Sequence, residues 1–235
     1  MRARIRVDEL MDDPGLDPAA HDAALAGLAR LNRWSGSRWL LWRAVESMAR
    51  ERNATGRPLR VMDIACGSAD GPIAMATRAA RAGLRIEWTF ADASAHALEV
   101  ARARADAMGL QVTTVVADAI AAPLPCRADL VSCSLFIHHC EADEAIAVMR
   151  HMREAAEQAV AITDLDRTRA GLALAWLGSR ALTRSPIVHF DALASVRAAF
   201  SRSEAGGLAE AAGLDGARIE RAWPERWRLL WRRGR

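Results

Sequence analysis

The fold is indicated by the stretch Leu59-Arg60-Val61-Met62-Asp63-Ile64-Ala65-Cys66-Gly67-Ser68-Ala69-Asp70-Gly71. The apolar run 59–64 predicts a β-strand, and the small residues after it predict a turn in which a ligand can approach the backbone. The turn lacks the G-x-G-x-x-G pattern of dinucleotide sites and has no lysine for a phosphate-binding loop. We therefore expect it to bind a ligand other than a pyrophosphate.

The same rhythm of strand, turn and amphipathic helix repeats along the chain after this stretch. Such alternation predicts an α/β fold, in which a parallel sheet carries helices on both faces. The expected parallel strands are 59–64, 85–91, 112–116, 129–134 and 160–163, and the expected helices between them are 71–82, 94–108 and 143–156.

The two ends of the chain differ from this rhythm. Strand-like runs at 218–223 and 226–232 are joined by a link too short for a helical crossover, so they must pair antiparallel. In the second run Trp227, Leu229 and Trp231 fall on one face, which predicts packing in the core. At the N-terminus we expect a helix over 21–31 and a second helix, capped by Ser35 or Ser37, that carries the apolar residues between 39 and 48.

The charged residues limit the chemistry that the chain can perform. It has 235 residues with 32 basic and 29 acidic side chains, and every basic residue is arginine. Without lysine no Schiff base can form, and without tyrosine no phenol can relay a proton. The charges alternate in sign along the chain, which indicates solvated faces and predicts no nucleic-acid partner.

The cysteines and the N-terminus predict a cytoplasmic protein. Cys66, Cys126, Cys133 and Cys140 form no C-x-x-C pair, so we interpret them as reduced thiols. The N-terminus turns acidic before any apolar run develops, which predicts no signal peptide. No run of 18 apolar residues occurs, so we expect no membrane span.

Acidic residues stand at or just after the ends of three expected strands. Asp63, Asp70, Asp92 and Asp118 should therefore gather at one edge of the sheet, where ligands of open parallel sheets bind. Several carboxylates around one cleft repel an anion and suit a cation. S-adenosylmethionine carries a sulfonium, an ammonium and a ribose diol, so it fits this pattern physically.

Four motifs in order resemble those of the class I S-adenosylmethionine-dependent methyltransferases. Residues 61–70, V-M-D-I-A-C-G-S-A-D, resemble the family's V-L-D-x-G-x-G-T-G, with alanine in place of the flanking glycines. Residues 90–94 resemble its G-x-D-x-S, residues 117–119 its G-D-A, and residues 122–131 the loop L-P-F-x-D-x-x-F-D-x-V. The resemblance is strong over 58–164 and looser to the C-terminus. We expect the two alanines to be tolerated where the backbone does not need positive φ.

This resemblance implies a fold, a cofactor and a set of cofactor residues. The fold would be a Rossmann-like, seven-stranded, mostly parallel sheet with an antiparallel C-terminal strand. The cofactor would be S-adenosyl-L-methionine, leaving S-adenosyl-L-homocysteine as product, with Asp92 on the ribose hydroxyls and Asp118 at the adenine edge. The implied cofactor-binding residues are Asp63, Ala65, Gly67, Ser68, Asp70, Asp92, Ala93, Asp118, Ala119 and Ser134.

A pair of histidines follows the expected fourth strand. Residues 135–140, L-F-I-H-H-C, resemble the L-H-H segment of small-molecule methyltransferases. In natural-product O-methyltransferases of this kind, one such histidine acts as a base with an Asp at the end of strand five. The resemblance therefore implies His139 or His138 as base, with Asp164 orienting it or the acceptor. Adjacent histidines cannot easily face one ion, so we expect no metal.

The resemblance also implies how the chain is organised. We expect an N-terminal helical lid over 1–57 and a methyltransferase domain over 58–235, with a helical acceptor-pocket insertion at about 168–212. Residues 188–214 resemble the ubiquinone/menaquinone C-methyltransferases and enzymes that act on aromatic polyketides. The expected substrate-binding residues are Asn32, Arg33, Trp176, His189 and Arg197.

The favoured hypothesis is O-methylation of a small aromatic or polyketide-like metabolite. C-methylation of a quinol or isoprenoid precursor is the main alternative. An RNA or protein methyltransferase and a non-catalytic cofactor-binding module are further alternatives. The expected partner is a small-molecule acceptor. The sequence leaves open whether the chain forms a homodimer.

Overall fold

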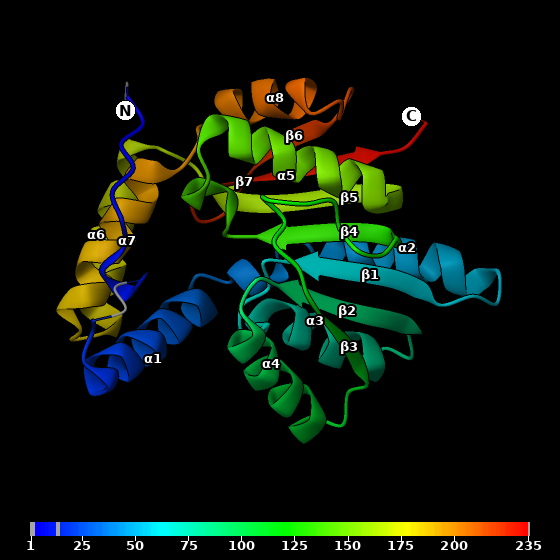
Figure 1. Ribbon diagram of the computed structural model, residues 1–235, viewed down its shortest axis with the longest axis horizontal. Coiled ribbons are helices and arrows are strands. Elements are labelled where there is room, and N and C mark those ends of the chain that lie inside the picture. The colour runs from blue at the N-terminus through cyan, green and yellow to red at the C-terminus, as the bar shows by residue number, and fades with distance from the viewer. Residues whose placement is uncertain (1–2, 13–14, 235) are drawn as a thin grey trace.

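A seven-stranded sheet runs through the molecule, with its strands in the order β3-β2-β1-β4-β5-β7-β6 (Figure 1). The computed structural model describes residues 3–12 and 15–234. β1 to β5 pair in parallel, whereas β7 pairs antiparallel with both β5 and β6, as the sequence predicted. The strands are β1 (Leu59–Ile64), β2 (Ile86–Asp92), β3 (Val112–Val116), β4 (Ala128–Ser134), β5 (Ala156–Leu165), β6 (Arg218–Ala222) and β7 (Arg226–Arg232).

Helices cover both faces of this sheet. None of them, within the described residues, is long and apolar enough to cross a membrane. The α-helices are α1 (Pro18–Trp34), α2 (Trp42–Ala54), α3 (Asp70–Arg81), α4 (Ala95–Ala107), α5 (Ala142–Ala155), α6 (Arg169–Leu182), α7 (Pro186–Ala198) and α8 (Arg202–Ala211). Short 3-10 turns are η1 (Leu10–Asp12), η2 (Ser37–Trp39) and η3 (Ile137–His139).

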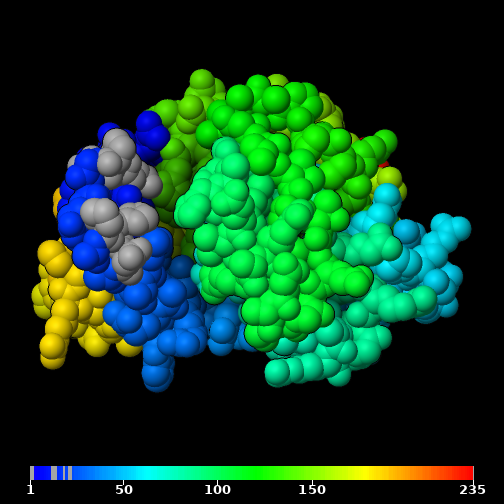
Figure 2. Space-filling model, turned by 60° about the horizontal axis from the view of Figure 1, so that its bottom comes forward, coloured from blue at the N-terminus to red at the C-terminus, as the bar shows by residue number. Residues whose placement is uncertain are grey.

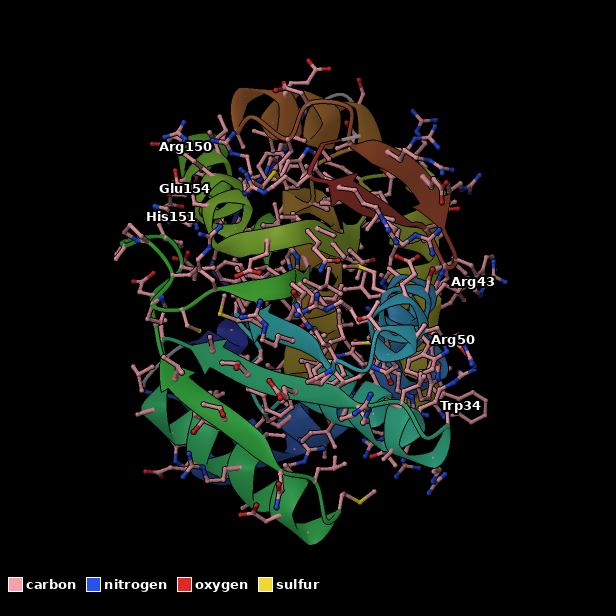
Figure 3. All side chains as sticks on the ribbon, turned by 90° about the vertical axis from the view of Figure 1, so that its right-hand side faces the viewer. Trp34, Arg43, Arg50, Arg150, His151 and Glu154 are labelled. Atoms are coloured by element: carbon pink, nitrogen blue, oxygen red, sulfur yellow. The ribbon has the colours of Figure 1, made fainter. Side chains whose placement is uncertain are left out.

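The alternation of apolar residues in β1 assigns one hydrophobic core to each face. Leu59 and Val61 belong to the core under α2, α3 and α4. Met62 and Ile64 belong to the core under α5 and α8, because successive side chains of a strand point to opposite faces. Charged side chains of α2 and of α5 project outward on opposite sides of the sheet in Figure 3, so each helix buries only its apolar face.

The C-terminal strand closes the second core. Trp227, Leu229 and Trp231 are buried on the α5 and α8 side of the sheet, so their predicted core packing is confirmed. The indole Nε1 of Trp227 donates to the Phe200 carbonyl at 3.0 Å. This bond satisfies the polar atom of a large, fully buried ring.

A further group of helices lies beyond the carboxyl ends of β1 and β4. In Figure 1 these strands point toward α1, α6 and α7. Figure 2 shows the blue N-terminal residues beside the yellow α6–α7 region. Helix α8 lies elsewhere, over α5 and β6, so only the first two helices of the segment 168–212 stand at the strand ends. Because β1 is flanked by β2 and β4, these ends include the switch point of the sheet.

The second N-terminal helix begins later than the sequence indicated. Gly36 adopts a left-handed conformation with φ 68°, and the chain makes only the 3-10 turn η2 before α2 starts at Trp42. The hydroxyls of Ser35 and Ser37 both donate to the Asn32 carbonyl at 3.1 Å. They therefore close the end of α1, and neither serves as the predicted cap.

Candidate functional site

A cavity of about 870 Å³ opens where the carboxyl ends of β1 and β4 meet the helices α1, α6 and α7. Its lining includes residues from α6 and α7 and from four other places in the chain that bear on the site. These four places are the loop after β1, the turn η3 after β4, the α1–η2 region, and the start of β7. Such an edge is where an open α/β sheet binds its ligand.

The loop after β1 has a left-handed residue at every second position. Ala65, Gly67 and Ala69 have φ values of 47°, 53° and 56°. The condition under which we expected the alanines to be tolerated is therefore not met, because both stand at positive φ. A left-handed alanine costs about 1–2 kcal/mol relative to a relaxed backbone, so the packing around the loop must impose this conformation.

Asp63, the penultimate residue of β1, is buried and lines the cavity. Its Oδ2 accepts a hydrogen bond from the Ser132 hydroxyl at 2.6 Å. Burial raises the pKa of this carboxyl to about 7, although the Ser132 bond favours the charged form. Asp63 is thus poised to ionise when a cation arrives beside it.

Two of the predicted cofactor aspartates, Asp92 and Asp118, lie outside the cavity lining. Asp92 accepts the amide of Gly67 at 2.7 Å and the amide of Ser94 at 2.9 Å. Asp118 accepts the amides of Ile120 and Ala121 at 2.9 and 3.1 Å. Both carboxylates thereby shape the loops in which they stand. Of the other predicted cofactor residues, Ala93 and Ala119 also lie outside the lining, and Asp63, Ala65, Gly67, Ser68, Asp70 and Ser134 lie within it.

Asp70 has a partner that the sequence did not indicate. Its carboxylate forms an ion pair with Arg104 of α4, and the same guanidinium donates to the Ser68 hydroxyl at 3.0 Å. Arg104 therefore ties the loop after β1 to α4. Asp70 contributes shape to the site, and its charge is balanced.

Asp164, near the end of β5, holds His138 of η3. The His138 Nδ1 lies 2.6 Å from Asp164 Oδ1, and the His138 amide donates to Oδ2 at 3.0 Å. A carboxylate at Nδ1 keeps the proton on that nitrogen and leaves Nε2 as the basic atom. Burial alone would lower the pKa of His138, but the charge and hydrogen bond of Asp164 raise it above its ordinary value.

His139 is the weaker base of the pair. Its ring lies 4.2 Å from the His138 ring, centroid to centroid. Burial, reinforced by the neighbouring His138, lowers the pKa of His139 to about 4, so this ring is neutral at ordinary pH. Glu9 completes the group, because one ligand atom each of Glu9, His138 and His139 lie within 4.8 Å of one another.

The N-terminal segment fixes the turn that carries both histidines. Arg4 Nη2 donates to the carbonyls of His138 and Cys140 at 3.0 and 2.6 Å, and its Nε donates to the Ala198 carbonyl at 2.6 Å. Arg6 Nη1 donates to the His139 carbonyl at 2.7 Å. Residues more than a hundred positions away thus hold the turn. No local pattern in the sequence gave a signal for this contact.

The predicted acceptor residues divide into two groups. Asn32 and Arg33 line the cavity. Trp176, His189 and Arg197 lie outside its lining, which corrects their assignment to the pocket wall. These residues lie outside the lining because other faces of the two helices point to the cavity. Helix α6 presents Leu174 and Ala175, and α7 presents Ala192 and Ser195. Trp176 instead lies 48% exposed under the Arg180 guanidinium, and His189 Nε2 lies 2.9 Å from the Thr183 carbonyl.

Of the arginines in the cavity wall that were not predicted from the sequence, two have an unpartnered Nε among the described residues. Arg38 of η2 and Arg226 of β7 line the cavity, and each has a buried Nε for which the described residues supply no hydrogen-bond partner. Arginine is so frequent in this chain that its pattern gave no signal for either position.

Comparison with known proteins gives a family match for the central part of the chain. Residues 61–158 match a family model described as "Methyltransferase domain". A search of curated proteins found no match. Among solved structures, the S-adenosylmethionine-dependent methyltransferase SibL in its apo form gives a TM-score of 0.67 at 22% identity. The similar region covers 98% of this chain but only 63% of SibL, so the chain spans less than two thirds of that protein.

Two other solved structures share the fold. The plantazolicin methyltransferase BamL, solved with a triazolic desmethylPZN analog and SAH, gives a TM-score of 0.59 at 19% identity, over 83% of this chain and 70% of BamL. The magnesium protoporphyrin IX methyltransferase ChlM from Synechocystis PCC 6803, with bound SAH, gives 0.56 at 17% identity, over 95% of this chain and 91% of ChlM. The predicted Rossmann-like sheet is confirmed by its strand order and by these likenesses.

Proposed function

We propose that the chain transfers a methyl group from S-adenosylmethionine to a hydroxyl of a small aromatic or polyketide-like metabolite, because residues 61–158 match a methyltransferase domain and the sheet has the strand order expected for it. The observation that carries the proposal is one shared cavity. Asp63 and Gly67 of the loop after β1 line it together with His138, the histidine paired with Asp164. A cofactor loop and a base therefore face the same space.

The residues around the loop fit the proposed cofactor. A methyl group added at Gly67 would meet no atom within 4 Å, so the loop leaves open space for a ligand against its backbone. Asp63 offers a carboxylate to a cationic group. The guanidinium of Arg38, with its buried Nε unpartnered, offers a counter-charge to the carboxylate of the methionine moiety.

S-adenosylmethionine, when bound, supplies the methyl group as a sulfonium and leaves as S-adenosylhomocysteine. His138 accepts the proton of the acceptor hydroxyl on Nε2 as the new oxygen–carbon bond forms and the sulfur–carbon bond breaks. Asp164 stabilises the imidazolium that results and keeps the ring oriented. The chain needs no nucleophile of its own, since alignment and exclusion of water lower the barrier of such a displacement.

His139 has a different role in this proposal. It is neutral at ordinary pH because burial and the adjacent His138 lower its pKa to about 4. A neutral imidazole beside the base can accept a hydrogen bond from the acceptor without competing for the transferred proton. We therefore assign proton abstraction to His138.

The proposal is tested in two steps. Calorimetric titration with S-adenosylhomocysteine should give saturable binding, and no binding at millimolar ligand would overturn the proposed cofactor. Turnover of phenolic acceptors should fall by about 10²–10⁴-fold in His138→Gln, the range that general-base catalysis contributes. His96→Gln is the control, because His96 lies exposed on α4, with its Nδ1 3.8 Å from the Glu99 carboxylate. Product NMR distinguishes the O-methyl product from the C-methyl product of the alternative hypothesis.

A further inference from the structure

Arg226, the first residue of β7, places a guanidinium in the wall of the cavity. The residue is only 5% exposed. It pairs in the sheet with Leu165 of β5 and lines the cavity near His138 and Ser35. Burial lowers the pKa of Arg226 to about 10, against the opposing charge of Asp164, so the side chain stays cationic at neutral pH.

The described residues leave this buried cation poorly satisfied. Its Nε is buried without a hydrogen-bond partner. Its Nη1 donates to the Pro224 carbonyl at 3.5 Å and its Nη2 to the Ser35 hydroxyl at 3.4 Å, and both distances are long for such bonds.

Arg167 shows how this fold satisfies a buried arginine when no ligand is needed. Arg167 is 4% exposed, and its Nε donates to the Ala199 carbonyl at 3.0 Å. Its Nη2 reaches both carboxylate oxygens of Glu204. Arg226 has no equivalent ion pair among the described residues.

Asp164, whose charge acts on Arg226, and Glu225, its neighbour in the sequence, have other partners. Asp164 accepts from His138 Nδ1, from the His138 amide and from the Leu165 amide. Glu225 accepts from the Thr168 hydroxyl at 2.6 Å and forms an ion pair with Arg221. A third, external anion is therefore the partner that the guanidinium lacks.

We propose that Arg226 binds a carboxylate of the acceptor, so that the acceptor is an aromatic hydroxy acid. The inference rests on the proposed function for the presence of an acceptor. A buried charge without a partner is costly, and a carboxylate matches the planar fork of a guanidinium with two parallel hydrogen bonds. Because Arg226 and His138 line one cavity, a small molecule can place its carboxylate on the first and its hydroxyl on the second.

The position of Arg226 in the sheet separates this subsite from the cofactor loop. The loop follows β1, and Arg226 starts β7, with β4 and β5 between them. At about 4.8 Å per strand the two lie roughly 14 Å apart across the sheet. Arg38, beside the loop, is the arginine placed for the cofactor's own carboxylate.

The test compares matched acids and amides. The 2-, 3- and 4-hydroxybenzoates and the corresponding hydroxybenzamides are titrated calorimetrically into the wild-type protein, with and without saturating S-adenosylhomocysteine. At least one acid should bind about 10- to 100-fold more tightly than its amide, the range expected for charge-assisted hydrogen bonds. Equal affinity of acid and amide for all three isomers would overturn the proposal.

Substitutions test whether Arg226 is the residue that causes the preference for the acid over the amide. Arg226→Gln should reduce the difference between acid and amide to within about threefold and leave S-adenosylhomocysteine affinity unchanged. It should also keep or raise Tm, because it removes a buried charge that forms no ion pair with the described residues. Arg226→Lys keeps the positive charge but loses the planar guanidinium, so its preference for the acid over the amide should be intermediate. If Arg226→Gln does not fold, the lysine variant tests the role of Arg226. Arg228→Gln is the control, since Arg228 of the same strand pairs with Glu220 and donates to the Leu40 carbonyl.

The two proposals fail in different ways. Absence of S-adenosylhomocysteine binding overturns the proposed function, while the acid preference measured without that ligand still decides the role of Arg226. An acid preference that survives in Arg226→Gln, or a loss of S-adenosylhomocysteine affinity in that variant, overturns the assignment of Arg226 to the acceptor.

Discussion

Asp164 binds His138 at two points, with its Oδ1 2.6 Å from the ring Nδ1 and its Oδ2 accepting the backbone amide at 3.0 Å. The end of β5 thereby fixes both the orientation of the ring and the turn η3 on which it stands. Since both groups are almost fully buried, the charge of Asp164 acts on the imidazole with little screening by water.

The pH dependence of turnover should report this pair. His138 must be neutral to act as a base, and Asp164 raises its pKa, so kcat should rise with pH through a midpoint above the usual 6.5. Asp164→Asn removes the charge, so the midpoint should move to lower pH. The asparagine amide also favours the wrong tautomer, and kcat on the plateau should fall roughly 10- to 100-fold. Steady-state rates between pH 5.5 and 9 measure both effects.

The control for this profile is Asp166→Asn. Asp166 is also buried, but its Oδ1 accepts the Arg202 amide, away from the histidines. Its replacement should leave the midpoint in place. A midpoint that does not move in Asp164→Asn would show that His138 is not the titrating base.

The buried carboxylate of Asp63 should lower the stability of the folded protein and support binding of the cofactor. Its pKa of about 7 lies above the unfolded value near 3.8, so the folded state holds the proton more tightly and stability is lost as pH rises from about 4 to about 7. Asp63→Asn should therefore raise the free energy of unfolding at pH 8, by up to about 4 kcal/mol at about 1.4 kcal/mol per tenfold change in proton affinity. The gain should shrink toward pH 4, and S-adenosylhomocysteine binding should weaken.

Denaturant unfolding at pH 8 and pH 4.5 measures the stability effect, and calorimetry measures the binding. Asp106→Asn, an exposed acid on α4, is the comparison and should stay within about 0.5 kcal/mol of wild type. If Asp63→Asn is destabilised equally at both pH values, the buried charge is not the cause.

A glycine at Ala65 should stabilise the loop after β1. Ala65 has φ 47°, where a Cβ costs about 1–2 kcal/mol, and the added chain entropy of glycine offsets part of the gain. We expect Ala65→Gly to raise the free energy of unfolding by about 0.5–1 kcal/mol in thermal or urea denaturation. Ala74→Gly within α3 should lower it by about 1 kcal/mol, because there the backbone is helical. If Ala65→Gly and Ala74→Gly change the free energy of unfolding in the same direction, the positive φ of Ala65 does not destabilise the loop.

Arg4 should act through the position of the histidine turn. Arg4→Met keeps the length and the contact with the Phe200 ring but removes the donors to the carbonyls of His138, Cys140 and Ala198. The loss of these charge-assisted bonds should lower stability by about 1–3 kcal/mol. It should also lower kcat without changing the affinity for S-adenosylhomocysteine. Arg218→Met, at an exposed ion pair with Glu220, should change neither kcat nor affinity.

Methyl transfer should continue after treatment with a chelator. The proposed base is activated by Asp164, so EDTA followed by desalting should leave kcat within about twofold. A loss of activity that zinc restores would instead assign the group Glu9, His138 and His139 to a metal ion, since its ligand atoms lie within 4.8 Å of one another.

The sequence by itself determined the order of the elements and the core. In β1 the alternation of Leu59 and Val61 with Met62 and Ile64 specifies two buried faces, and a strand with two buried faces belongs inside a sheet. The placement of Asp164 beside the histidine pair was also predictable, because the ends of neighbouring parallel strands meet at one edge, but the sequence left open whether His138 or His139 is its partner.

Only the tertiary structure decided which polar residues reach the cavity. Glu9, Arg38 and Arg226 line it from distant parts of the chain. A sequence so rich in arginine carries no local pattern that distinguishes a buried guanidinium from an exposed one. The rotation of α6 and α7 turned Trp176 and His189 away, since helix packing sets which face is inward. The left-handed alanines have the same origin, because the surrounding packing holds Ala65 and Ala69 in a conformation that their side chains disfavour. Local sequence preferences thus determined the helices and strands. Long-range packing determined which side chains meet at the strand ends to form the candidate site.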